Sequence, residues 1–572
     1  LPRFTENILF SMNWDDIIYV SLLVSSIGFG HLYVHLPVGS ARRWVGTCVG
    51  LIIMTVVSGI HTLHPLLVSV INLLILQFVS KRWCHVVSLV VSFSYLLMFR
   101  LCSYIGLPDP PGHTNAIQMM MTLKLVGVCF EVHDTWQLKK DIKKSTEVLA
   151  TSPPATNSDS KTTKPEDQVE TTDGTELRKR DVKSDEGETV TRSKPAPKSP
   201  EELHEDLQLR LKYEAVEPSA LDVMHYVFNY CGILTGPYYK YRVYSDMVEG
   251  VSGGKQLVTW WWCMQRLRYL PLYGVLFLLS SHFFPLQFAE STTIFSDYNI
   301  MYRIAYMTPV FFTFRMRLYS GFVLSECVCI MAGLGAYPSD SKPKPGKGPT
   351  LYKQLESSDD RSNESYNYET VHNIDEYGAD FTATVREGMR CWNMTVQYWL
   401  ATNIYKRMAA PKPLKEAVTM LVSAYWHGMY TGYYLSLLTV PFILMIEDYY
   451  ARLIRRKLAE KGTRIYDWVT WFLKMQWFAY MGMAFLLLRV DTTLTYWRSI
   501  GFVGHGLILV LHAFAQFVNL VYGKAQFKLK KASETAFGKD SRLKVKSIPE
   551  LEKQVKEERR LKLLAAAAKK EE

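Results

Sequence analysis

Apolar stretches separated by short polar loops dominate the first quarter of the chain. A membrane-spanning helix needs about 20 mostly apolar residues. Stretches of this kind run from Ile17 to Leu36, Val45 to Ile60, Pro65 to Val79, Cys84 to Phe99 and Ala116 to Val132. The pattern predicts a first transmembrane block at residues 14–136, preceded by an N-terminal extension at residues 1–13. This extension lacks the features of a cleaved signal peptide.

The charges of the loops predict how this block is oriented. The first loop carries Arg42 and Arg43 and the third carries Lys81 and Arg82, whereas the second contains no Lys or Arg. Cytoplasmic loops of membrane proteins carry an excess of Lys and Arg. We therefore expect the first and third loops in the cytosol and the N-terminus in the lumen.

A polar segment follows the first block. No Phe, Trp or Tyr occurs at residues 137–212, which are rich in Lys, Glu, Asp, Ser, Thr and Pro. A segment of this composition buries too little apolar surface to offset the entropy of the chain. We expect a disordered cytosolic linker at residues 137–212.

Apolar segments resume after the linker and predict a second transmembrane block at residues 213–522. Several are too short or too polar for a simple span, so we expect some of them to be re-entrant or buried in the bundle. The segments are Leu221–Tyr239, Tyr269–Phe284, Ile304–Phe314, Leu318–Leu334, Met394–Ile404, Ala417–Ile446, Trp468–Val490 and Ile500–Tyr522. The predicted fold is all-α, a multi-pass transmembrane helical bundle with about 11 crossings.

The last segment, residues 523–572, is predicted to be a charged tail. An odd number of crossings places this tail in the cytosol. The chain ends in Lys569, Lys570, Glu571 and Glu572, which resembles the dilysine signal of proteins retrieved to the endoplasmic reticulum. We expect a protein of the endoplasmic reticulum membrane.

Composition narrows the choice of partners. The formal net charge of +11 is compatible with nucleic-acid binding. However, the basic residues collect between and after apolar runs, as they do in membrane proteins, so we expect no nucleic-acid partner. The 9 cysteines lie mostly in or beside apolar runs and form no paired CxxC motifs, so we assign no metal site.

Polar residues inside apolar segments are the candidates for chemistry, because a charge at the centre of a spanning helix costs about 2.5 to 3.5 kcal/mol. His427 lies in a long apolar stretch, between Trp426 and Gly428. A neutral imidazole is a competent general base; the alternative is a hydrogen-bonded structural histidine. Asn393 follows Trp392 where another apolar segment begins. Its amide is suited to an oxyanion or to orienting a base; the alternative is a packing or capping residue.

Arg315, Arg317 and Glu326 form a charged group within apolar surroundings. One interpretation is a buried ion pair. The other is a site for a phosphate or inositol group, since arginine recognises phosphate through two parallel hydrogen bonds. The sequence contains no Walker loop, nucleophile elbow or HExxH motif, so a histidine base would act without an obvious covalent nucleophile.

These motifs occur in an order that resembles the membrane-bound O-acyltransferase family, and most of all its lysophosphatidylinositol acyltransferase branch. Asn393 in a Trp-Asn motif and His427 in a Tyr-Trp-His-Gly motif carry the resemblance, together with matching segments through most of the chain. These segments are Gly59–His64, Phe93–Leu97, Gly106–Pro108, Thr114–Ala116, Thr122–Val126, Gly232–Arg242, Phe314–Arg317, Gly333–Pro338 and Tyr368–Gln397.

The resemblance implies a helical bundle that encloses a catalytic chamber, with His427 as the base and Asn393 as its polar partner. It also implies acyl-CoA as co-substrate, no cofactor, and membrane lipids as partners. Lysophosphatidylinositol is the implied acceptor, acylated at sn-2 with a polyunsaturated, arachidonoyl-type chain. The residues expected to contact substrate are Tyr425, Trp426, Trp392, Gln397, Arg315 and Arg317.

Two other functions stay open from the sequence alone. One is acyl transfer to a different acceptor, such as another lysophospholipid, a sterol or a protein. The other is a non-catalytic scaffold or a transporter, for which charges inside the membrane are typical. The halves of the chain show no inverted repeat, which disfavours a transporter.

Overall fold

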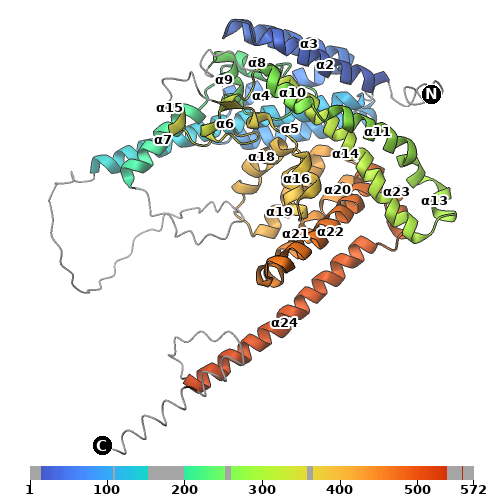
Figure 1. Ribbon diagram of the computed structural model, residues 1–572. Coiled ribbons are helices and arrows are strands. Elements are labelled where there is room, and N and C mark those ends of the chain that lie inside the picture. Colours follow the sequence, from blue (N-terminus) through green and yellow to red (C-terminus); the bar gives the residue numbers. More distant parts are fainter. Residues whose placement is uncertain are drawn as a thin grey trace, which may run out of the picture.

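The computed structural model is almost entirely helical (Figure 1) and describes residues 14–106, 108, 110–151, 199–250, 259–356, 365–537 and 557. Within these residues, 5 helical stretches are long and apolar enough to cross a membrane, and Cys84–Arg100 forms a shorter apolar helix. The 5 stretches are Asp16–Tyr33, Ser40–Phe78, Gly112–Ala150, Thr259–Glu290 and Val503–Val521. The multi-pass helical fold is confirmed, while the number of crossings stays a prediction. The N-terminal extension lies outside the described residues.

The first block has one central helix. Its helices are α2 (Trp14–Tyr33), α3 (Ser40–Ser58), α4 (Leu63–Phe78), α5 (Cys84–Arg100) and α6 (Gly112–Thr151). Helix α6 is mostly buried and packs against α3, α4, α5 and, later in the chain, α18 (Met394–Asn403). It therefore connects the first block to the segment that carries Asn393.

The predicted linker is too wide at both ends. Helix α6 continues to Thr151, and α7 (Pro200–Glu214) begins after a capping box formed by Ser199 and Glu202. The two helices pack against each other, and buried leucines at 138, 207 and 209 lie in these helical ends. The expectation rested on the composition of the whole segment, whereas aliphatic side chains are buried locally at these two ends. Residues 152–198 lie outside the described part.

Short helices and a small hairpin follow. They are α8 (Ala220–Val227), α9 (Tyr241–Glu249), α10 (Thr259–Leu267), α11 (Leu270–Phe283), α12 (Leu286–Glu290), α13 (Thr292–Ser296) and α15 (Lys353–Glu356). Strands β1 (Tyr337–Pro338) and β2 (Tyr366–Asn367) pair antiparallel, with Tyr337 opposite Asn367. Single 3₁₀ turns occupy Gly59–Thr62, Cys102–Ile105, Ser339–Ser341, Glu369–Val371, Tyr405–Arg407 and Arg455–Lys457.

Two predicted segments are joined in one long helix. Ile304–Phe314 and Leu318–Leu334 were expected as separate apolar segments, but α14 (Ile300–Met331) runs through both and through Pro309. The charged residues between the two segments do not end the helix, because Arg315 finds a partner in Asp380 and Arg317 is largely exposed. Helix α14 packs against α2, α10, α11 and α22 (Glu460–Leu487).

In the last third of the chain, one predicted segment is divided into several helices. The apolar stretch Ala417–Ile446 is divided into α19 (Lys412–His427), α20 (Thr431–Leu437) and α21 (Val440–Leu453). The other helices here are α16 (Glu376–Phe381), α17 (Val385–Arg390), α23 (Val490–Ser499) and α24 (Val503–Phe537). Helices α16, α18, α19, α20 and α22 lie together beneath the first block in Figure 1, and α24 extends away from them. The backbone of α24 continues helical beyond the predicted start of the tail at residue 523.

Candidate active site

Helix α19 ends at His427. Two prolines, at 411 and 413, lie at its start, where a missing N–H costs nothing, and the next residue after His427 is Gly428. A Cβ atom on Gly428 would lie 2.7 Å from the ring of Tyr433. A larger residue at this position would therefore collide with Tyr433, where α20 approaches the end of α19.

The His427 ring lies among aromatic side chains and is only partly buried. The ring centroid is 4.9 Å from that of Trp426, 5.0 Å from that of Phe485 and 5.8 Å from that of Tyr433. Within the described part of the chain, no group forms a hydrogen bond with the imidazole. Both ring nitrogens are left for a substrate, which is what a general base requires.

Asn393 occupies a special backbone position at the start of α18. Its φ of 48° and ψ of 51° are in the left-handed region, which asparagine tolerates better than most residues. Its side chain does not cap the helix. The amide is therefore not used as an ordinary helix cap, and no other group of the described residues binds it.

A buried network holds the turn that precedes α18. The Asn373 side chain accepts hydrogen bonds from the backbone and hydroxyl of Thr395, at 3.2 and 2.6 Å. Glu326 accepts from the backbone N–H groups of Asn373 and Ile374 and is paired with Arg266. These contacts fix the backbone on both sides of Asn393, since the N–H of the next residue also donates to the Asn373 carbonyl.

Gln397 also holds the turn that precedes α18. Its side-chain amide donates to the carbonyls of Met389 and Trp392, at the turn that leads into Asn393. Its predicted contact with substrate stays untested, but its amide N–H groups are engaged by the backbone. Trp392 is surrounded by rings of α14, with a centroid distance of 5.7 Å to Tyr319.

The structure brings the Asn393 and His427 segments together. Helices α18 and α19 pack against each other. A row of rings joins the two motifs: Trp392 and Phe314 are 6.5 Å apart, Phe314 and Phe485 are 5.9 Å apart, and Phe485 contacts His427. The two polar side chains therefore belong to one apolar interior, although they were found in separate segments of the sequence.

The two aromatic residues before His427 use their polar atoms within the protein. The Tyr425 hydroxyl donates to the Phe93 carbonyl at 3.0 Å, and the Trp426 indole N–H donates to the Met119 carbonyl at 3.1 Å. These bonds attach the end of α19 to α5 and α6. The two residues were expected to contact substrate, and the structure gives both of them an anchoring role.

The charged group of α14 does not form the predicted cluster. Arg315 pairs with Asp380, Arg317 donates to Asp16 at 3.0 Å, and Glu326 pairs with Arg266. The interpretation in which these three residues pair with one another is wrong, and the alternative of a phosphate or inositol site stays untested. Arg315 and Glu326 are three turns apart, about 16 Å along the helix, and residues two positions apart point to different faces.

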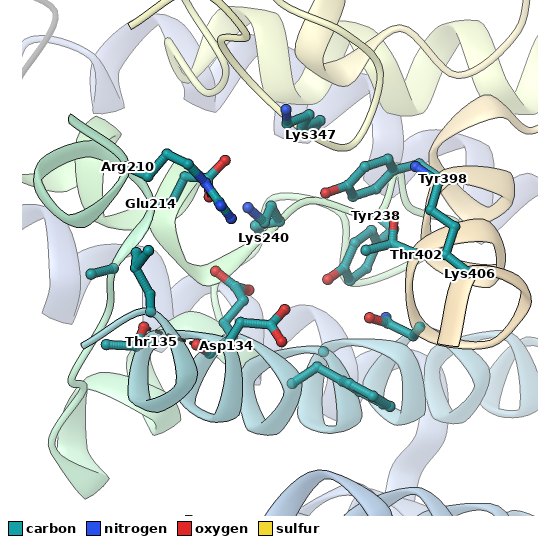
Figure 2. Close-up of a pocket in the computed structure, with 16 residues that line it drawn as sticks. Asp134, Thr135, Arg210, Glu214, Tyr238, Lys240, Lys347, Tyr398, Thr402 and Lys406 are labelled. Atoms are coloured by element: carbon teal, nitrogen blue, oxygen red, sulfur yellow. Dashed lines mark hydrogen bonds and ion pairs between the residues drawn. The ribbon is translucent and has the colours of Figure 1, made fainter. Parts of the chain in front are cut away.

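A basic pocket, missed by the sequence analysis, lies between α6, α7, α18 and two loops (Figure 2). Its volume is about 250 Å³. Charged residues from five separate segments line it, together with Tyr238 and Tyr398: Glu131, Asp134, Arg210, Glu214, Lys240, Lys347 and Lys406. The basic residues Lys240, Lys406 and Arg407 can be seen in the sequence, but nothing in the sequence indicates that they lie close together.

The carboxylates of this pocket are already engaged. Glu131 accepts from two backbone N–H groups at the start of α9, Asp134 pairs with Arg407, and Glu214 pairs with Arg210. By contrast, none of the three lysines forms an ion pair with a described residue. The four basic residues of the pocket outnumber its three carboxylates by one, and the three lysines have no direct ion-pair partner among the described residues.

The protonation of the pocket follows from its buried charges. Burial opposes the charge of Lys240, but the surrounding acidic groups, Glu131 and Glu214 among them, outweigh it and raise the pKa of Lys240. Burial likewise opposes ionisation of Glu214, yet Lys240 and Arg210 lower the pKa of that carboxyl. Burial lowers the pKa of Lys347. At neutral pH, Lys240 is thus a cation and Glu214 an anion.

Comparison with known proteins places this site in a family. The model of the membrane-bound O-acyltransferase family matches residues 112–490. The chain belongs to the membrane-bound O-acyltransferase family. The match includes both Asn393 and His427, and it spans the basic pocket as well as the helices around the two motifs. The protein is therefore a member of a family of multi-pass membrane acyltransferases.

Within this family, curated relatives of the same kind cover most of the chain. A membrane-bound acylglycerophosphatidylinositol O-acyltransferase of Danio rerio is 36% identical over 514 residues, 89% of this chain and 95% of the relative. Its counterpart in Homo sapiens is 38% identical over 500 residues, 87% and 93%. That of Drosophila melanogaster is 34% identical over 499 residues, 86% and 90%. The predicted resemblance is confirmed.

Proposed function

We propose that the protein transfers an acyl group from acyl-CoA to the free sn-2 hydroxyl of lysophosphatidylinositol, inside the membrane. The observation that carries the proposal is the His427 imidazole, which has no hydrogen-bond partner among the described residues and ends a helix packed against that of Asn393. The acceptor rests on the relatives, which are named acylglycerophosphatidylinositol O-acyltransferases. Resemblance to that branch also supports a polyunsaturated donor chain of the arachidonoyl type.

The proposed reaction is a direct transfer. His427 takes the proton of the lysolipid hydroxyl as the oxygen attacks the thioester carbonyl of acyl-CoA. The oxyanion of the tetrahedral intermediate accepts a hydrogen bond from the Asn393 amide. The carbon–sulfur bond then breaks, and the protonated His427 returns the proton to the CoA thiolate. A general base contributes roughly 100- to 10,000-fold to such a reaction, and an oxyanion donor about 100- to 1,000-fold.

The basic pocket supports acyl-CoA as the donor. CoA carries a nucleotide with three phosphate groups, and Lys240, Lys347 and Lys406 offer unpaired ammonium groups to them. Gly127 of α6 lines the pocket, and Met119 of the same helix accepts the hydrogen bond from Trp426. These two residues are about 12 Å apart along the helix. The pantetheine arm is suited to this distance and would bring the thioester to His427.

The same geometry supports a cytosolic opening of the pocket. Arg43 and Lys81 lie in the two loops predicted to be cytosolic, and they pair with Asp222 and Glu217, at 3.0 and 3.9 Å. His133, next to the pocket residue Asp134, contacts the Lys81 carbonyl. We propose that this face is cytosolic, that the N-terminus is lumenal and the C-terminus cytosolic, and that the protein resides in the endoplasmic reticulum membrane.

The test uses membranes of cells that lack endogenous lysophospholipid acyltransferase activity and express the full chain. Arachidonoyl-CoA is supplied with one lysophospholipid at a time, and both the diacyl product and free CoA are measured. We expect product and CoA in equal amounts with lysophosphatidylinositol. Turnover with another acceptor would overturn the proposed substrate, and no turnover with any acceptor would overturn the enzymatic function in favour of a scaffold or transporter.

A further inference from the structure

Arg100, at the end of α5, binds the backbone of the helix that carries His427. Its guanidinium donates to the carbonyls of Tyr425, Trp426 and His427, at 2.7, 2.5 and 3.2 Å. Its fourth hydrogen bond, at 3.0 Å, is to the side-chain oxygen of Asn115. Arg100 is separated from the helix end by more than half of the chain and was not a candidate from the sequence.

These contacts complete the end of α19. The last four carbonyls of a helix have no partner within it. Here the Gly428 N–H donates to the Ala424 carbonyl, and Arg100 satisfies the three that remain. The planar guanidinium has its donors in a fixed fork. One side chain therefore sets the backbone of the residue whose ring is proposed to act as the base.

The neighbouring contacts attach the same turn to the first block. Tyr425 is bonded to α5 and Trp426 to α6. Asn115 of α6, in turn, orients Arg100. The side chain of His427 is the one member of this turn whose polar atoms are not engaged within the described residues. The turn is rigidly held, while its imidazole is left free.

Arg100 also affects the charge of the site. The C-terminal end of a helix has partial negative charge and stabilises a protonated histidine. The charged and titratable groups that face His427 are Arg100 of α5 and Tyr433 of α20, whereas α22 presents Phe485. The Arg100 cation occupies the helix end, offsets its negative charge and disfavours a second positive charge on the imidazole.

We propose that Arg100 is a positioning residue for the transfer reaction: it fixes the last turn of α19 and keeps the His427 imidazole neutral and directed at the substrate. This inference rests on the proposed function. A misplacement of about 1 Å in a reacting group lowers rates by about 100-fold, so Arg100 would act on the catalytic step without contacting either substrate.

The experiment compares wild type, Arg100→Gln and Arg100→Lys in the acyltransferase assay, per amount of folded protein. We expect Arg100→Gln to lower kcat by about 100-fold, with the KM values of both substrates within about twofold of wild type. The acidic limb of its pH–rate profile should move up by about one pH unit. Arg100→Lys keeps the positive charge but loses the fixed geometry of the guanidinium donors. We therefore expect the acidic limb of its pH–rate profile to stay at the wild-type pH, while kcat falls by about tenfold.

Arg303→Gln is the matched control. Arg303 also donates to backbone carbonyls, among them that of Ser499 at 2.8 Å, and it has no part in the proposed site. Its kcat and pH profile should equal those of wild type. If the Arg100 variants do not fold, Asn115→Ala removes the bond that orients Arg100, along with a weak contact at 3.6 Å to the Met119 sulfur, and should lower kcat without changing KM.

Three results would overturn the inference. One is an Arg100→Gln enzyme with wild-type kcat. Another is a KM for the lysolipid raised tenfold or more at unchanged kcat, which would make Arg100 a substrate-binding residue. A third is an Arg100→Gln enzyme with a lowered kcat but an acidic limb at the wild-type pH, which would leave only a structural role. Wild-type membranes without turnover on any acceptor would refute the proposed function itself.

Discussion

Replacing Lys347 with glutamine tests whether the basic pocket binds the nucleotide of acyl-CoA. Lys347 is partly buried at the pocket and forms no ion pair with the described residues, so its replacement by glutamine breaks no ion pair. Lys240 is less suitable, because Glu131 and Glu214 depend on its charge. A hydrogen bond to a charged group contributes about 1.5 to 3 kcal/mol. Since two other lysines share the phosphates, we take the lower end, about 1.5 kcal/mol, which corresponds to roughly tenfold in affinity.

The assay measures initial rates of free thiol release as a function of donor concentration. For Lys347→Gln we expect the KM for arachidonoyl-CoA to rise about tenfold, at unchanged kcat. The same variant is then given arachidonoyl-pantetheine, which lacks the nucleotide phosphates, and its KM should equal that of wild type. Lys353→Gln is the control, because Lys353 pairs with Glu205 on the surface, at 2.9 Å. Equal KM increases for both donors, or none for acyl-CoA, would refute the assignment.

Two further predictions concern packing and pH. In Gly432→Ala, the new Cβ would lie 2.1 Å from the Ala484 carbonyl oxygen, so we expect no monodisperse protein on gel filtration, whereas Gly506→Ala meets nothing within 4 Å and should behave as wild type. Burial opposes the charge of His372, but the bond to Glu369 outweighs it and raises the pKa of His372 from 6.5 to about 9. The contribution of protonated His372 to the stability of the fold is complete below pH 6.5 and is lost as the pH rises to about 9. The melting temperature should therefore fall over this range in wild type but less in His372→Gln; equal slopes would contradict this.

Local features of the sequence predicted the positions of the helices well. The apolar runs at α2 to α5 match the observed helices within a few residues, because each run is bounded by polar or charged residues. The end of α19 was not predicted, because His427 and Gly428 lie within an apolar stretch that the sequence showed as one segment. By contrast, the sequence showed α14 as two segments, because it did not reveal that Asp380 neutralises Arg315.

The surroundings of Asn393 and His427 could not be predicted from the sequence, because they depend on contacts between distant parts of the chain. Arg100 and the end of α19, or Lys240 and Lys347, are brought together only by the packing of helices far apart in the chain. Asn393 and His427 were selected for their residue types within apolar segments, and the family resemblance gave them roles. The partners that orient their segments, such as Asn373, have no local pattern that distinguishes them from other polar residues.

The central claim is that His427 is the base for acyl transfer. We would measure the formation of acylated product by wild type and by His427→Gln in the same membranes, at equal amounts of folded protein and saturating substrates. We predict that His427→Gln loses activity by at least about 100-fold without losing expression. A His427→Gln enzyme that keeps the wild-type rate would contradict the account.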